Sequence, residues 1–161
     1  MTLQDLLAGA TARLEAAHLA YGHGTTNARD EAAWLVLWQL HLPLDGDLEE
    51  MAETPVSDED ALAVAELITR RIETRQPAAY LTHEAWLQGV PFYVDQRAIV
   101  PRSFIAELIA DGGFDAWLGE HTTRVLDLCT GNGSLAVLAA LAWPQVQVTG
   151  ADLSTDALAV A

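Results

Sequence analysis

The first part of the chain repeats apolar residues at helical spacing in three segments. The first segment places them three and four positions apart, which predicts an amphipathic helix beginning after Thr2. Residues 32–38 are apolar on nearly every side, so we expect a central helix capped by Asn27 and closed by Pro43. A third helix is expected after Ser57. Its inward face is predicted to be Leu62, Ala65, Leu67, Ile68 and Ile72.

Arginines gather where this third helix should end. Arg70, Arg71 and Arg75 fall in its last turns, where cations complement the helix dipole. The pair Gln76-Pro77 then stops the helix, because proline disfavours a helical residue before it. Residues 1–76 therefore predict a small helical domain.

From residue 77 the hydrophobic period changes. Aromatic and β-branched residues dominate Tyr80–Val100, and Gly89 separates Trp86-Leu87 from Phe92-Tyr93-Val94. This pattern predicts a β-hairpin within a linker over residues 77–102. Ser103 is expected to cap a short helix that breaks at Gly112-Gly113.

The last segment follows the order strand, glycine turn, helix, strand. Arg124–Cys129 predicts a buried strand, and a turn over Thr130–Gly133 leads into a helix that Pro144 closes. Residues 146–152 predict a second strand, and Ser154 can cap a further helix. This order is that of the first βαβ unit of a doubly wound sheet. The expected fold class is α+β overall, with the start of an α/β sheet over residues 103–161.

Composition narrows the classes of partner. The chain has 161 residues, 51% of them hydrophobic, and a formal charge of −15, and its eight basic residues are all arginine. This balance disfavours direct nucleic-acid binding and anionic membranes, which need clustered cations. It suits a basic protein partner, or serves solubility. With no signal peptide and no apolar run long enough to cross a bilayer, we expect a cytoplasmic protein.

No metal site is expected. The single cysteine, Cys129, excludes a disulfide within the chain and a cysteine-cluster metal site. His83-Glu84 starts like a zinc-protease helix, but Leu87 stands where the second histidine would be. Cys129 is interpreted as a small residue packed at the strand end rather than as a nucleophile.

Candidate chemistry lies at the glycine turn. Gly131 and Gly133 stand where a strand meets a helix N-terminus, and glycines there let a ligand approach the backbone. Asp152 follows the next strand, where a carboxylate can accept both hydroxyls of a ribose. The alternative is a structural helix entry with a solvated aspartate.

The spacing alone does not decide between two adenosine-containing ligands, NAD(P) and S-adenosylmethionine. Gly131, Gly133 and Ala136 also satisfy the dinucleotide fingerprint, which keeps an NAD(P)-dependent oxidoreductase fragment as an alternative. Asp127 lies inside the buried strand, and its charge suits a cationic ligand better than a pyrophosphate. S-adenosylmethionine carries a sulfonium and no phosphate. A non-catalytic interaction module is the third reading.

Sequence motifs carry a family resemblance. Asp127-Leu128-Cys129-Thr130-Gly131-Asn132-Gly133 resembles the first motif of class I S-adenosylmethionine-dependent methyltransferases, and Asp152 matches their acid after the second strand. The stretches Pro77–Trp86, Phe92–Val94 and Val100–Ser103 with Glu107–Ile109 are similar to the protein-(glutamine-N5) methyltransferases. The His-Glu-Ala-Trp and Val-Pro-Arg-Ser forms look like the branch acting on large-subunit ribosomal protein L-three.

The resemblance implies an architecture and a set of residues. Residues 1–76 would recognise substrate, and residues 103–161 would form an incomplete Rossmann-like domain that binds S-adenosyl-L-methionine. The donor would be bound by Asp127, Cys129, Thr130, Gly131, Asn132, Gly133 and Asp152. Arg102 and Glu107 would form a wall of the site, and Asn132 is expected to tolerate left-handed backbone.

One departure limits what the resemblance implies. The family's catalytic Asn-Pro-Pro-Tyr does not occur in this sequence. No catalytic residue is therefore assigned, and the chain is expected to be an N-terminal portion of the enzyme that is inactive alone.

Overall fold

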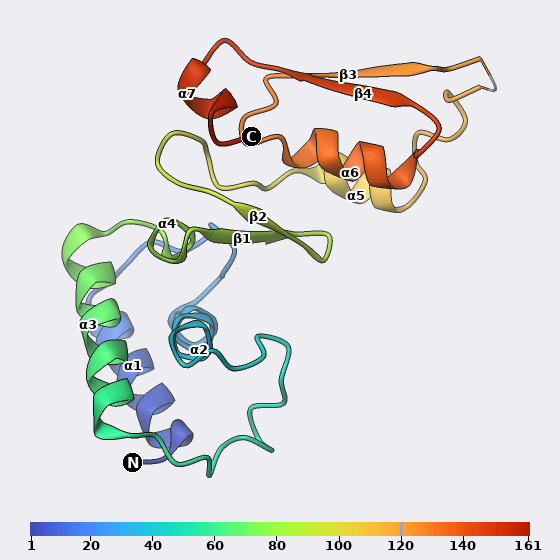
Figure 1. Ribbon diagram of the computed structural model, residues 1–161. Coiled ribbons are helices and arrows are strands. Elements are labelled where there is room, and N and C mark those ends of the chain that lie inside the picture. The colour runs from blue at the N-terminus through green and yellow to red at the C-terminus, as the bar shows by residue number, and fades with distance from the viewer. Residues whose placement is uncertain (120) are drawn as a thin grey trace. The chain divides into compact units, whose positions relative to one another are not determined.

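The computed structural model describes residues 1–119 and 121–161 and divides them into two compact units. The first unit is Met1–Thr82 and the second is His83–Ala161. Helices and small sheets are both present, so the chain is α+β, as predicted (Figure 1). Within the described residues, no helix is both long and apolar enough to span a membrane.

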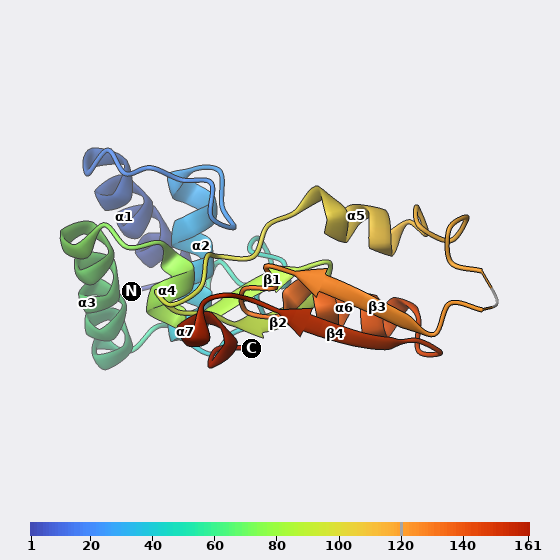
Figure 2. The ribbon, with the colours of Figure 1, turned by 90° about the horizontal axis from the view of Figure 1, so that it is seen from above.

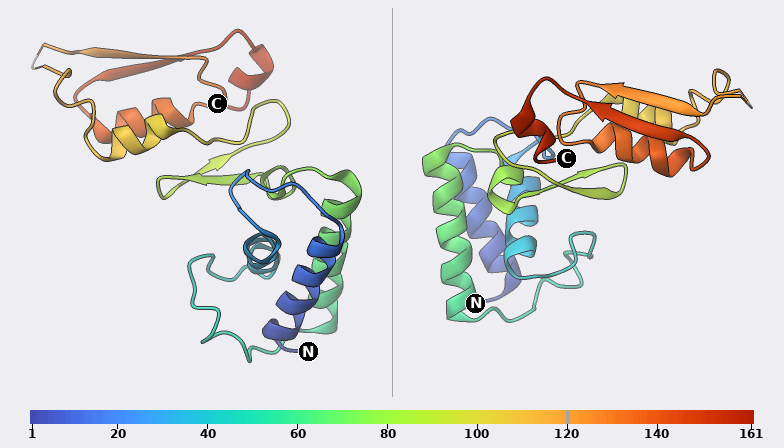
Figure 3. Two further views of the ribbon diagram at one scale, coloured as in Figure 1. Left: turned by 180° about the vertical axis from the view of Figure 1, so that it is seen from behind. Right: turned by 45° about the horizontal axis from the view of Figure 1, so that its top comes forward.

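The first unit is helical. It consists of α1 (Leu3–Ala16), α2 (Ala28–Gln39), α3 (Asp58–Thr74) and the short α4 (Ala78–Thr82). The predicted caps of the three long helices are confirmed, because the side chains of Thr2, Asn27 and Ser57 each accept a hydrogen bond from the backbone N–H three residues on. The helix α2 contacts both α1 and α3 and has Leu35 and Val36 completely buried, as expected for a central helix (Figure 3).

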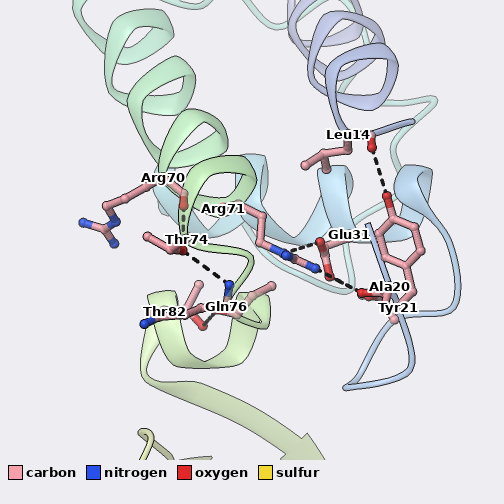
Figure 4. Close-up of polar contacts among 11 residues, drawn as sticks. Leu14, Ala20, Tyr21, Glu31, Arg70, Arg71, Thr74, Gln76 and Thr82 are labelled. Carbon is pink, nitrogen blue, oxygen red and sulfur yellow. Dashed lines mark hydrogen bonds and ion pairs between the residues drawn. The ribbon is translucent and has the colours of Figure 1, made fainter. Parts of the chain in front are cut away.

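A buried ion pair crosses this helical core. Arg71 Nε of α3 lies 2.7 Å from Glu31 Oε1 of α2, and both side chains are almost fully buried (Figure 4). Arg71 also donates to the carbonyl of Ala20, and Thr25 donates to the second oxygen of Glu31. These bonds fasten the loop before α2 to the ends of two helices. Each buried charge therefore has its own hydrogen-bonding partners.

The buried face of α3 differs from the predicted inward face, and it includes Arg71 of this ion pair. Leu62 was expected to face the core but is 66% exposed, whereas Val64, Leu67, Ile68 and Arg71 are buried. These four follow the spacing of one helical stripe, and a charged residue completes it. Arg71 acts as a core residue because Glu31 neutralises it. Apolar spacing alone could not reveal that partner, which lies on another helix.

The second unit begins with the predicted hairpin. Strands β1 (Glu84–Leu87) and β2 (Val90–Tyr93) pair antiparallel, and Gln88 and Gly89 between them both have positive φ. Two such residues are what the tight turn of a two-residue hairpin requires. The hairpin was expected within the aromatic-rich stretch Tyr80–Val100, and it lies there. The start of that stretch is helical, however, because residues 78–82 form α4 and the first strand starts at Glu84.

A parallel βαβ unit follows the hairpin. After α5 (Phe104–Ala110), which Ser103 caps as predicted, come β3 (Arg124–Leu128), α6 (Ser134–Ala142), β4 (Gln147–Ala151) and α7 (Thr155–Leu158). Strands β3 and β4 are parallel and pair Asp127 with Gly150, with α6 along one face (Figure 2). The core that joins hairpin, α5 and α6 contains Phe92, Ala106, Ile109, Leu138 and Trp143.

The expectation that Arg124–Cys129 forms a fully buried strand is wrong. Val125 packs toward the core, but Leu126 and Leu128 are 58% and 70% exposed. Strand side chains alternate between faces, and among the described residues α6 covers only one face of this pair. The leucines of the other face therefore stay exposed, although the sequence has the apolar run typical of a strand buried on both sides.

Candidate functional site

The chain turns sharply between β3 and α6. Cys129, Gly131 and Gly133 have φ values of 62°, 58° and 78°, so every second residue of the turn is left-handed. The two glycines adopt this conformation without a Cβ clash. Asn132, which was expected to tolerate a left-handed backbone, is not among the residues with positive φ. Cys129 occupies that conformation instead, because the backbone already bends at the residue after the strand.

Asp152 joins this turn to the end of β4. Its Oδ2 accepts a hydrogen bond from Gly131 N, and its Oδ1 accepts one from Ser154 N, both at 2.9 Å. The backbone N–H groups of Ser154 and Gly131 lower the pKa of Asp152 below its ordinary value of 3.8. The carboxylate is therefore charged at neutral pH. Each oxygen keeps a further acceptor site, since an ionised carboxylate has about four lone-pair sites.

Asp127 and Thr130 hold the turn from the side of β3. Thr130 Oγ1 donates to Asp127 Oδ2 at 2.6 Å, and Thr130 N donates to the carbonyl of Ala151 at 3.1 Å. Thr130 thus bonds to both strands of the sheet. Gly150 makes room for it, because a Cβ at Gly150 would lie 2.8 Å from Thr130 Oγ1.

Asn132 points into the protein. It is 8% exposed, and its Nδ2 donates to the carbonyl of Tyr93 at 3.2 Å. Gly133 follows as the N-cap of α6 without any side-chain cap, so the first N–H groups of this helix are not capped by a side chain. Such groups are the usual partners of an electron-rich ligand atom.

The other residues predicted for the site are exposed at the surface. Cys129 is exposed, so the interpretation that it packs at the strand end is wrong. Arg102 and Glu107 are exposed, just before and within α5, and their role as a wall of the site stays a prediction. Among the described residues, no group of three His, Cys, Asp or Glu side chains is arranged to hold a metal ion.

Sequence reasoning missed three contributors to this arrangement. They are Tyr93, Gly150 and Ser154. A glycine inside a strand can signal a close approach of another group, so Gly150 had a readable signal. Ser154 was recognised only as a helix cap. The carbonyl of Tyr93 gave no sequence signal, because it is a backbone acceptor thirty-nine residues away from Asn132.

An apolar hollow lies beside β3, lined from α5, β3 and α6. It has a volume of about 390 Å³ and is lined by Trp117, Trp143, Leu126 and Leu128 among others, with Asp127 as its charged member. One side of Asp127 thus faces apolar surface, while its Oδ2 is bonded to Thr130. The turn itself combines two carboxylates with a helix start that no side chain caps. It offers hydrogen-bond acceptors and negative charge, which suit a ligand that has hydroxyls and a positive charge.

The chain is similar to curated methyltransferases. No protein-family model matches it. Curated relatives match over 99% of its length at 46–52% identity, and they are named as methyltransferases. This confirms the resemblance inferred from its motifs.

These relatives are all named ribosomal protein uL3 glutamine methyltransferase. The chain is 52% identical to the protein of Burkholderia pseudomallei, covering 52% of it, and 52% identical to that of Bordetella pertussis, covering 54%. It is 46% identical to the protein of Neisseria meningitidis serogroup B and covers 53% of that protein. The chain therefore spans about half the length of the curated relatives it matches.

Proposed function

We propose that this chain supplies the methyl-donor site of a protein methyltransferase that acts on a glutamine side chain of ribosomal protein uL3. The observation that carries the proposal is the bridge from Asp152 to the Gly131 amide, which places a charged carboxylate directly at a bare glycine turn. The names of the relatives supply the substrate and the reaction.

The donor set fits S-adenosyl-L-methionine. Asp152 has acceptor capacity left for ribose hydroxyls, because each of its oxygens holds one backbone N–H. Asp127 adds negative charge toward a sulfonium and an amino group, and its bond to Thr130 fixes its orientation. Gly131 and Gly133 leave room for the ligand to approach the main chain. Thr130, Cys129 and Asn132 complete the turn that positions these groups.

The bound donor would supply an electrophilic methyl group. An amide nitrogen is a weak nucleophile because its lone pair is delocalised into the carbonyl. Methylation therefore depends on orientation more than on a strong base. The residues described here hold the donor end of that arrangement. Since Asn-Pro-Pro-Tyr does not occur in the sequence, we assign no residue of this chain to the glutamine.

The proposal also assigns roles to the segments. Residues 103–161 would be the start of a Rossmann-like donor-binding domain, residues 77–102 a hairpin linker, and residues 1–76 the part that recognises the protein substrate. Residues 45–60 support this last role, because this exposed stretch has eight acidic side chains and no basic one. Such a surface attracts a basic protein.

Calorimetric titration of the full 161-residue chain tests the proposal. S-adenosylmethionine and the demethylated product, S-adenosylhomocysteine, should each give saturable binding, and NAD should give none. The oxidoreductase alternative makes the opposite prediction, since Gly131, Gly133 and Ala136 match its fingerprint. Tight NAD binding without binding of S-adenosylmethionine or S-adenosylhomocysteine would overturn the proposal.

A further inference from the structure

The middle residue of the glycine turn is fastened to the hairpin. Asn132 stands between two glycines, so it carries the only side chain of residues 131–133. That side chain is buried, and its amide donates to the Tyr93 carbonyl at the end of β2. The resemblance implies a donor-binding role for Asn132, but the structure commits its amide to the protein.

The hairpin end that receives this bond is itself ordered by side-chain contacts. The ring of Tyr93 stacks on His83, with centroids 5.5 Å apart and planes 10° apart. The Tyr93 hydroxyl donates to Asp95 Oδ2, and Asp95 also accepts from the guanidinium and backbone N–H of Arg97. The side chain of Tyr93 is 52% exposed, so the ring remains accessible beside the turn.

We propose that Asn132 is a positioning residue that holds the end of the hairpin at the donor turn, so that Tyr93 forms one wall of the donor site. The inference rests on the proposed function, because it concerns the same site. The turn is then fixed from three directions: by Asp127 on its own strand, by Asp152 on the next strand, and by the hairpin through Asn132.

The bond to the Tyr93 carbonyl requires the side-chain amide of Asn132 as its donor. A carboxamide can donate to a carbonyl, whereas a carboxylate of the same shape can only accept. Asn132→Asp therefore keeps the volume and replaces an attraction by the repulsion of two oxygens. Breaking the bond would also leave the buried side chain at position 132 without its partner, which is costlier than losing an exposed bond. The hairpin end should then move away from the turn.

Fluorine NMR of the full chain tests this coupling. The chain has three tyrosines, so labelling with 3-fluorotyrosine gives three reporters. Tyr93 lies in the second compact unit, whereas Tyr21 and Tyr80 lie in the first and serve as internal controls. The spectrum is recorded with and without S-adenosylhomocysteine, and calorimetry on the same samples measures whether the ligand binds.

In the wild-type chain, ligand should shift the Tyr93 resonance and leave the other two in place. Asn132→Asp should change the Tyr93 resonance without ligand, weaken binding by about five- to tenfold, and reduce the ligand-induced shift at saturation. Asn27→Asp is the matched control, since it also replaces a side-chain amide that donates to a neighbour, in this case Asp30, but at a helix cap in the first compact unit. It should leave both readouts as in the wild type.

Two results separate the possible failures. If S-adenosylhomocysteine binds while the Tyr93 resonance stays fixed, the inference is wrong and the proposed function stands. If the ligand does not bind to the wild type at all, the proposed function fails and the inference fails with it. Should Asn132→Asp not fold, Asn132→Ala removes the same donor with less repulsion. Unchanged binding and an unchanged Tyr93 shift in that variant overturn the inference.

Discussion

At the residue scale, Asp152 has a double use. Its two oxygens already accept backbone N–H groups from the turn and from the start of α7, yet the carboxylate stays partly exposed. A side chain fixed in this way loses little conformational freedom when a ligand binds, because its rotamer is already set. The same carboxylate therefore shapes the turn and, in the proposed function, would offer acceptors to a ribose.

The Asp152 bridge predicts a specific acid response. The N–H donors of Ser154 and Gly131 lower the pKa of this carboxyl below 3.8, so its contribution to stability is fully present above pH 3.8. It should be lost as the pH falls through the lowered pKa. The Gly131 amide proton, followed by NMR from pH 6 downward, should shift with a midpoint below 3.8. A midpoint at or above the ordinary value would show that the bridge does not form.

Gly150 predicts a packing effect at the same turn. Gly150→Ala should push Thr130 away and break its bond to Asp127, because the new Cβ would lie 2.8 Å from Thr130 Oγ1. We expect a loss of about 1 kcal/mol in unfolding free energy, measured in urea, together with weaker donor binding.

Gly9→Ala is the matched control for that substitution. Gly9 lies in α1 with open space around its Cβ position, so alanine there should stabilise the chain by about 0.5–1 kcal/mol. Equal effects of the two substitutions would contradict the close approach of Gly150 to Thr130.

The sequence predicted the residues of the site better than their contacts. Gly131 and Asp152 were recognisable because a turn after a strand and an acid after the next strand have a fixed spacing in this fold. The left-handed Cys129 and the inward Asn132 were not, because a cysteine or an asparagine in a turn gives no local sign of its backbone conformation. The direction of the Asn132 side chain depends on a tertiary partner, the carbonyl of Tyr93.

At the element scale, helix starts were predictable and exposed faces were not. Thr2, Asn27, Ser57 and Ser103 each cap a helix through a local bond, and local bonds are visible in the sequence. Whether Leu126 is buried depends on which element lies over β3, which is a long-range property. The identity of α4 was missed for a similar reason, since its Ala78 and Leu81 pack into the core of the first unit.

The link between α2 and α3 predicts a large energetic effect. Removing one charge, as in Arg71→Met, leaves Glu31 buried without its partner and should cost about 3–5 kcal/mol of unfolding free energy. The double variant Glu31→Leu with Arg71→Met should cost much less than the sum of the single variants. Thermal and urea unfolding of the wild type, the two single variants and the double variant measure this. Additive losses would show that the two side chains do not interact.

At the scale of the whole molecule, charge should govern the encounter with the proposed protein substrate. The exposed acidic stretch over residues 45–60 lies in the first unit, and the chain has a formal charge of −15. Association with ribosomal protein uL3 should slow by roughly tenfold between low salt and 0.5 M salt. The triple variant Glu49→Gln, Glu50→Gln, Glu53→Gln should be slower at low salt and less sensitive to salt. Association rates independent of salt would exclude this role for the surface.

The most direct test of the donor site is a chemical-shift map of the isotope-labelled chain during titration with S-adenosylmethionine. The account predicts that the largest changes occur at the backbone amides of Gly131, Asn132, Gly133 and Asp152. It also predicts that these chemical-shift changes become much smaller in Asp152→Ala. Binding that leaves the Gly131 and Asp152 amides unmoved, or that clusters in the helical unit, would contradict it.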